Sequence, residues 1–142
     1  MVAVFDASVL VKLFLSESGS AWAEHAVHEH RIVAAPDLAH LEVASAITRA
    51  SRNGTIPSDD ARRQLAAWRR FATLGNVRFT PLAELQPRAE EWSLDLRHPL
   101  ADCVYLALAE ATNVPLITAD GPFADKARGR FERLRHLSEF AS

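Results

Sequence analysis

Four acidic residues of this chain stand where carboxylates could meet around a metal ion: Asp6, Glu42, Asp102 and Asp120. Asp6 directly follows the apolar run Val2–Phe5, and Asp120 ends a second apolar stretch, 114–119. Both stretches have the composition of short buried strands. Ligands bind beyond the carboxyl ends of strands in a parallel sheet, so we expect both aspartates at one functional edge.

Helix capping is the simpler interpretation of each aspartate taken alone. The side-chain oxygen of an aspartate that follows a strand often accepts a free backbone N–H of the next helix. For Asp6 or Asp120 alone, capping is the preferred interpretation. The presence of both, together with two further acids, favours a shared site.

The other two acids are predicted to lie on helices. Asp102 falls in the first turn of the most apolar helix of the chain, 100–111, where a lone acid could simply interact with the helix dipole. Glu42 lies on the helix 38–52 and shares a narrow polar line with Arg49 and Arg52. Its alternative role is that of an ordinary solvated residue.

Converging carboxylates require a cation or protons. Two unit charges about 4 Å apart repel by about 4 kcal/mol at an effective dielectric constant of about 20. Oxygen ligands without histidine or cysteine suit Mg²⁺ or Mn²⁺. Such an ion can orient a water molecule and offset the charge of a phosphodiester.

The elements that must position these acids alternate between strands and helices. We expect strands at 2–5, 31–35, 77–80, 114–118 and 131–137, and helices at 7–15, 20–30, 38–52, 58–72, 83–96, 100–111 and 123–127. This alternation indicates an α/β fold with helices on both faces of a mainly parallel sheet of four to five strands. The length of 142 residues is that of a single domain, 1–142.

Four local predictions accompany this scheme. Asp37 is expected to cap the helix that follows it, and the three tryptophans are expected to pack inward on helical core stripes. His98 is expected to do no more than enter the helix 100–111. Cys103 is expected to be a small core residue.

Composition narrows the classes of protein to be considered. No apolar run reaches the length of about 18 residues typical of a membrane span, and no signal peptide precedes the first strand. A single cysteine fits a reducing compartment, so we expect a cytoplasmic protein that does not contact membranes. The formal charge of −2 does not mark a nucleic-acid binder, although Arg49 and Arg52 could contact RNA phosphates.

The order of these motifs resembles the PIN domain and, more narrowly, the VapC-type toxins of bacterial toxin–antitoxin systems. The resemblance spans nearly the whole chain and rests on four segments, Phe5-Asp6-Ala7-Ser8, Leu41-Glu42-Val43, His98-Pro99-Leu100-Ala101-Asp102 and Ile117-Thr118-Ala119-Asp120. Each segment alone is weak support, but four in this order and at this spacing are specific.

The resemblance implies a PIN-like three-layer α/β/α sandwich and a Mg²⁺- or Mn²⁺-dependent endoribonuclease. It places the four acids in the metal site, with Ser8 and Thr118 as supporting polar groups. It further implies an RNA substrate, a small VapB-type antitoxin that holds the toxin inactive, and a homodimer.

Two other functions fit parts of the pattern. A receiver-like phosphoacceptor domain also gathers acids around Mg²⁺, but it usually has an adjacent acidic pair early in the chain and a lysine after a late strand. Here Lys126 follows a helix instead. A catalytically silent PIN-like binding module is the second alternative, and the presence of all four acids argues against it.

Overall fold

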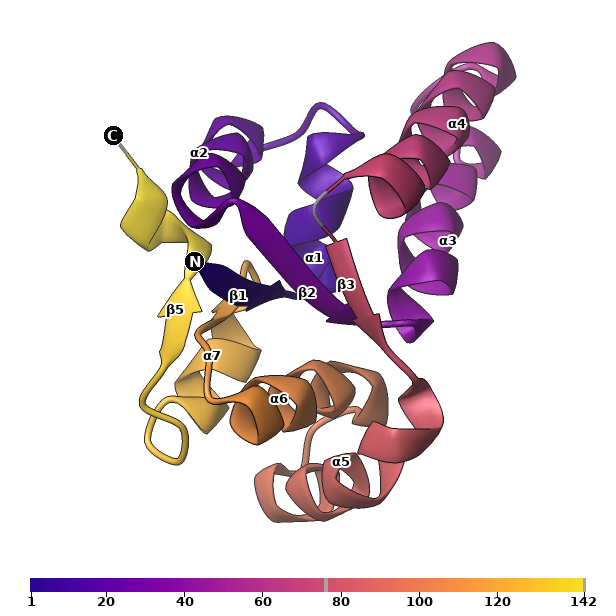
Figure 1. Cartoon of the computed structure of the whole chain (residues 1–142). Coiled ribbons are helices and arrows are strands. Elements are labelled where there is room, and N and C mark those ends of the chain that lie inside the picture. The colour runs from indigo at the N-terminus through magenta and orange to yellow at the C-terminus, as the bar shows by residue number, and fades with distance from the viewer. Residues whose placement is uncertain (76, 142) are drawn as a thin grey trace.

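The computed structural model describes residues 1–75 and 77–141, and in them one five-stranded sheet lies between two groups of helices (Figure 1). The strands are β1 (Val2–Phe5), β2 (Ile32–Pro36), β3 (Val77–Thr80), β4 (Leu116–Thr118) and β5 (Leu134–His136). The α-helices are α1 (Ala7–Leu10), α2 (Ser20–His30), α3 (Leu38–Arg52), α4 (Ser58–Leu74), α5 (Leu82–Leu96), α6 (Leu100–Thr112) and α7 (Gly121–Ala127). Two 3₁₀-helices, η1 (Val11–Leu13) and η2 (Leu137–Phe140), complete the set.

The sheet has the strand order β3-β2-β1-β4-β5, and every pairing is parallel. Helices α1 to α4 gather on one side and α5 to α7 on the other, as Figure 1 shows. The order changes direction at β1, whose neighbours are β2 and β4. The three-layer fold with a parallel sheet is therefore confirmed, and its topological switch point lies at the strand that ends before Asp6.

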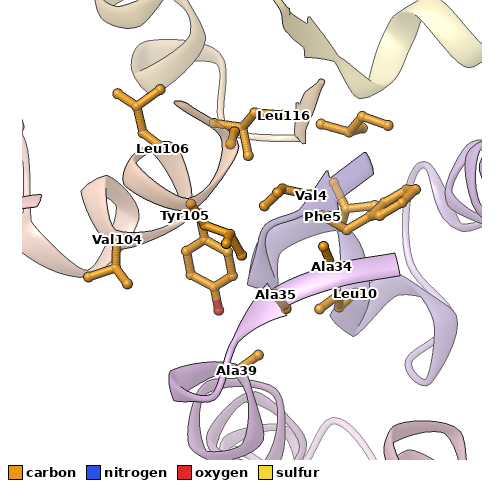
Figure 2. Close-up of a cluster of buried hydrophobic side chains, with 14 of the residues drawn as sticks. Val4, Phe5, Leu10, Ala34, Ala35, Ala39, Val104, Tyr105, Leu106 and Leu116 are labelled. Carbon is orange, nitrogen blue, oxygen red and sulfur yellow. The ribbon is translucent and has the colours of Figure 1, made fainter. Parts of the chain in front are cut away.

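Helix α6 is the most deeply packed helix, because seven consecutive residues, Cys103–Ala109, are buried. It contacts β1 and β2 on its inner side and α5 on its outer side. Figure 2 shows Tyr105 of α6 reaching past Ala35 of β2 towards Ala39 of α3, with its hydroxyl oxygen at the far end. A helix that is apolar almost all round requires such burial, as the sequence predicted. Cys103 is a buried core residue, as expected.

Most helices and strands begin and end within one or two residues of the predicted boundaries. Two elements, the first helix and the last strand, are shorter than predicted. The first helix is shorter than expected, because α1 ends at Leu10 and continues as the 3₁₀-helix η1. The last strand, β5, keeps only three of the seven residues expected at 131–137. It pairs in parallel with β4 at the edge of the sheet.

The local predictions for Trp22 and Asp37 were wrong. Trp22 on α2 is 36% exposed, whereas Trp68 and Trp92 are buried as predicted. Asp37 makes no capping hydrogen bond to α3; its Oδ1 accepts the backbone N–H of Leu82 at 2.8 Å. The carboxylate thus caps the beginning of α5, which the parallel pairing of β2 with β3 brings beside it.

Within residues 1–75 and 77–141, none of the helices combines the length and the apolar character needed to cross a membrane.

Candidate metal centre

Asp6 is held at the end of β1 by the neighbouring strand β4. Its backbone N–H donates to the carbonyl of Ile117 on β4 at 3.1 Å, and its side chain is only 3% exposed. Oδ1 accepts the backbone N–H of Val9 and the hydroxyl of Ser8. Asp6 is therefore the N-cap of α1, as the simpler interpretation held, and its carboxylate is also fixed at the edge of the sheet.

Asp120 has the equivalent position after β4. Its Oδ1 accepts the backbone N–H of Phe123 at 3.0 Å and caps α7. Ser8 ties the two strand ends together, because its hydroxyl donates to Asp6 and accepts the backbone N–H of Ala119 at 2.9 Å. The Thr118 hydroxyl accepts the N–H of Asp120 and also hydrogen-bonds to Asp6. Ser8 and Thr118 are thus in the supporting positions that the resemblance assigned to them.

Glu42 approaches the same edge from α3, on the other side of the sheet from α6. Its Oε1 accepts the Tyr105 hydroxyl at 2.6 Å. Burial and the neighbouring Glu42 charge raise the pKa of the Tyr105 phenol well above its ordinary value, so the phenol stays protonated and donates. This bond ties the Glu42 carboxylate on α3 to the buried helix α6.

Asp102 lies at the centre of the group. Its negative charge contributes to raising the pKa of both Asp6 and Glu42, after burial as the larger cause. One of its oxygens and one of Asp120 belong to a set of ligand atoms within 4.8 Å of one another. Asp102 is therefore the acid that links the group, because its charge acts on Asp6 and Glu42 and its oxygen lies near one of Asp120. Within residues 1–75 and 77–141, the set of ligand atoms that lie within 4.8 Å of one another does not include Asp6 or Glu42.

Burial is the main reason that the Asp6 carboxyl is hard to ionise. It raises the pKa of Asp6 from 3.8 to about 7, although the hydrogen bonds from Ser8, Thr118 and Val9 act in the opposite direction. The Asp102 charge raises it further. At neutral pH the Asp6 carboxyl of the metal-free protein is therefore only partly ionised.

The chemistry of this donor set fits a hard divalent cation. The Asp102 charge opposes ionisation of Asp6 and Glu42, and this repulsion is what a cation would relieve. Asp102 and Asp120 supply oxygens close enough to bind one ion together. We therefore identify this group as a candidate centre for a divalent cation.

His98 is a part of the site that the sequence analysis missed. Its Nε2 lies 2.7 Å from Oδ2 of Asp102, and one of its ring nitrogens belongs to the same set of ligand atoms as Asp102 and Asp120. The side chain is almost fully buried. The expectation that His98 only enters α6 was wrong. The four-residue separation from Asp102 was the one available sign of the contact.

The two candidate RNA-binding arginines face different surroundings. Arg49 lines an open depression together with Glu42 and Ser8, beside the acids. Arg52 lines another hollow, formed with residues of α4 such as Arg62. Arg49 is therefore the arginine that lies close to the candidate centre.

Comparison with known proteins gives a consistent result. The family model described as PIN domain matches residues 3–129. Ribonuclease VapC3 of Pyrobaculum aerophilum is 33% identical over 129 residues, which cover 89% of this chain and 95% of that protein. Ribonuclease VapC12 of Mycobacterium tuberculosis is 38% identical over 122 residues, covering 85% of this chain and 88% of that protein.

Solved structures agree on the fold. One chain of a toxin–antitoxin complex from Klebsiella pneumoniae superposes with a TM-score of 0.70 at 17% identity, covering 95% of this chain and 97% of that chain. The sarcin–ricin loop cleaving toxin VapC20 of Mycobacterium tuberculosis superposes with a TM-score of 0.65 at 18% identity, covering 91% and 95%. At such low identity these similarities concern the fold alone.

The pKa of Asp6 predicts how the stability of the metal-free protein depends on pH. An acid whose pKa is higher in the folded than in the unfolded state binds more protons when folded, so the free energy of unfolding falls as the pH rises. For Asp6 this fall should run from about pH 4 to about pH 7 and then level off. Urea unfolding in EDTA should show a shallower fall for Asp6→Asn than for the wild type.

Asp125→Asn on α7 is the matched control, because it also removes one carboxylate but from an exposed position. This variant should keep the wild-type fall. Equal slopes for the wild type and Asp6→Asn would contradict the electrostatic description of the site.

Proposed function

Because this chain belongs to the PIN domain family, we propose that it is a metal-dependent endoribonuclease and the toxin of a toxin–antitoxin pair. The observation that carries the proposal is that the Asp102 charge acts on Asp6 and Glu42, while an Asp102 oxygen lies within 4.8 Å of one of Asp120. The two relatives described above are ribonucleases that cover most of the chain, and the shared fold extends to toxins.

In this proposal Asp6, Glu42, Asp102 and Asp120 bind Mg²⁺ or Mn²⁺. When bound, such an ion supplies an activated water molecule and offsets negative charge on the phosphodiester. Ser8 and Thr118 hold Asp6 in place, and Tyr105 holds Glu42. These bonds keep the carboxylates in position before the substrate arrives, so little reorganisation is needed during the reaction.

The RNA backbone would approach along the depression beside Glu42. Arg49 lines this depression and is placed to contact a phosphate, with the guanidinium fork that suits phosphate oxygens. The exposed Leu41 lines it as well and offers an apolar surface to a base or sugar. Arg52 remains a predicted contact further along α3.

The proposal includes a small antitoxin of the VapB type, a second copy of the chain in a symmetric homodimer, and action in the cytoplasm without membrane contact. Support for the antitoxin comes from the structural similarity to a chain of a toxin–antitoxin complex. Exposed leucines at Leu94 on α5 and Leu100 at the start of α6 provide apolar surface for association.

A catalytically silent binding module is the less favoured function. A module that only bound RNA would have no use for four carboxylates, because acids repel phosphate. A receiver-like phosphoacceptor is excluded by membership of the PIN domain family.

RNA cleavage should require both a divalent cation and the central acids. Asp6→Asn and Asp102→Asn each remove a charge from the metal site, so each should reduce cleavage of total cellular RNA by about 100-fold or more. The assay compares purified protein with Mg²⁺, with Mn²⁺ and with EDTA, followed by mapping of the new RNA ends.

Asp125→Asn, on the exposed face of α7, should cleave at the wild-type rate and controls for the loss of one negative charge. Wild-type cleavage by either Asp6→Asn or Asp102→Asn, or undiminished cleavage in EDTA, would show that the proposed site is wrong.

RNA binding should depend on salt through Arg49. Each phosphate neutralised on single-stranded RNA contributes about −0.7 to the slope of log K against log salt concentration. Arg49→Ala should therefore flatten the slope by about 0.7, measured by fluorescence anisotropy with the cleavage-deficient Asp102→Asn background. Arg52→Ala, one helical turn away, should change the slope less. An unchanged slope for Arg49→Ala would move the RNA path elsewhere.

A further inference from the structure

His98 is surrounded by contacts that fix both its backbone and its ring. The backbone N–H donates to the carbonyl of Ser93, and the Ser93 hydroxyl donates back to the carbonyl of His98 at 2.6 Å. The ring stacks on Phe123 of α7 with centroids 4.7 Å apart. The imidazole therefore has little freedom to turn, and each ring nitrogen has a defined partner.

The partner of Nδ1 is Lys126, whose Nζ lies 3.3 Å away. Lys126 is itself held, because its Nζ donates to the carbonyl of Arg97 at 3.0 Å, where α5 ends in a left-handed conformation. An ammonium group has three donors and no lone pair. Nδ1 must therefore accept a hydrogen bond from Lys126, so it carries no proton.

The proton of the neutral ring consequently resides on Nε2, the nitrogen 2.7 Å from Oδ2 of Asp102. A nitrogen that carries a proton donates a hydrogen bond and has no lone pair for a metal ion. Distance alone would allow His98 Nε2 to bind an ion together with Asp102 and Asp120. The contact with Lys126 favours the role of hydrogen-bond donor to Asp102 over that of metal ligand.

We propose that Lys126 and His98 are positioning residues of the metal centre: Lys126 fixes the Nε2–H tautomer of His98, and His98 holds the Asp102 carboxylate ready to bind the ion. The inference rests on the proposed function, since it assigns Asp102 to the metal site. It goes beyond that function because it removes His98 from the ligands and gives a role to Lys126. Neither role was predicted from the sequence.

This arrangement affects which metal the site prefers. With Nε2 protonated, the ion meets carboxylate oxygens only, which suits Mg²⁺ and Mn²⁺. Without Lys126 the proton could move to Nδ1, and Nε2 would offer a lone pair beside Asp102 and Asp120. Imidazole nitrogen is a good ligand for Zn²⁺, so loss of Lys126 should shift preference from Mg²⁺ towards Zn²⁺.

Nitrogen NMR of the imidazole tests the tautomer without any metal. Long-range ¹H–¹⁵N correlation on the metal-free, full-length protein distinguishes a protonated ring nitrogen from an unprotonated one. The His98 ring should show a proton on Nε2 and none on Nδ1, and Mg²⁺ should leave this state unchanged. A proton on Nδ1, or loss of the Nε2 proton when Mg²⁺ binds, would overturn the proposal.

Metal binding tests the positioning role. Loss of a group that orients a metal ligand typically weakens binding 10- to 100-fold. By calorimetry, Lys126→Met should bind Mg²⁺ about 10-fold more weakly than the wild type, with a higher ratio of Zn²⁺ to Mg²⁺ affinity. Arg128→Met removes a positive charge from the exposed end of the same helix, and it should keep wild-type values for both metals.

A second pair of variants separates positioning from packing. His98→Phe keeps a ring to stack on Phe123 but has no N–H, whereas His98→Gln keeps an N–H donor without the ring. Mg²⁺ affinity should be lost in His98→Phe and largely retained in His98→Gln. Equal Mg²⁺ affinity of Lys126→Met and wild type, or better binding by His98→Phe than by His98→Gln, would overturn the positioning role.

The two sets of measurements also separate this inference from the function on which it rests. A wild-type protein that bound no Mg²⁺ would overturn the proposed function and the positioning role with it. Wild-type binding of Mg²⁺ together with an Nδ1–H tautomer would overturn the inference and leave the proposed function standing.

Discussion

Repulsion around the Asp102 carboxylate is the constraint on which the rest of the site depends. Asp102 lies close enough to Asp6 and Glu42 for its charge to raise the pKa of both, and close to Asp120 as well. A folded protein tolerates such a group only if its energy is offset by protons, by hydrogen bonds or by a cation. The residues around the acids offset this repulsion in these ways. Ser8, Thr118 and Tyr105 donate hydrogen bonds to the carboxylates, and the donor set suits a divalent ion.

The fold explains how the acids can meet despite this repulsion. The strand order changes direction at β1, so the ends of β1 and β4 lie side by side, and the first turns of α1 and α7 begin there. Capping and metal binding are compatible roles, since one carboxylate oxygen can accept a backbone N–H while the group still faces the other acids. The buried helix α6 carries Asp102 in its first turn and Tyr105 one turn later, and its packing against β1 and β2 fixes both.

The sequence correctly predicted the features of the fold and of the site that depend on short stretches of neighbouring residues. Apolar runs located β1 and β4, helical periodicity located α3 to α6, and strand ends followed by acids located the site. Two of the contacts that it missed join residues that are distant in the chain. Asp37 caps a helix that begins 45 residues later, and Lys126 reaches a histidine 28 residues earlier.

A helical wheel shows which residues share a face, but it does not show how completely a neighbour covers that face, and for this reason Trp22 was placed in the core. His98 was missed because a histidine before Pro99 has the same local pattern whether or not a carboxylate faces it.

Thermal unfolding of the wild type and Asp102→Asn, each in EDTA and in Mg²⁺, tests the metal centre most directly. Removing the central charge should stabilise the metal-free protein by about 1 kcal/mol, because repulsion is relieved in the folded state. Mg²⁺ should raise the melting temperature of the wild type and raise that of Asp102→Asn much less, since an ion bound only by the folded state shifts the equilibrium. If Asp102 served only the helix dipole, its loss would instead destabilise the metal-free protein by a few tenths to about 1 kcal/mol. A destabilised variant, combined with a wild type whose melting temperature does not respond to Mg²⁺, would contradict the account.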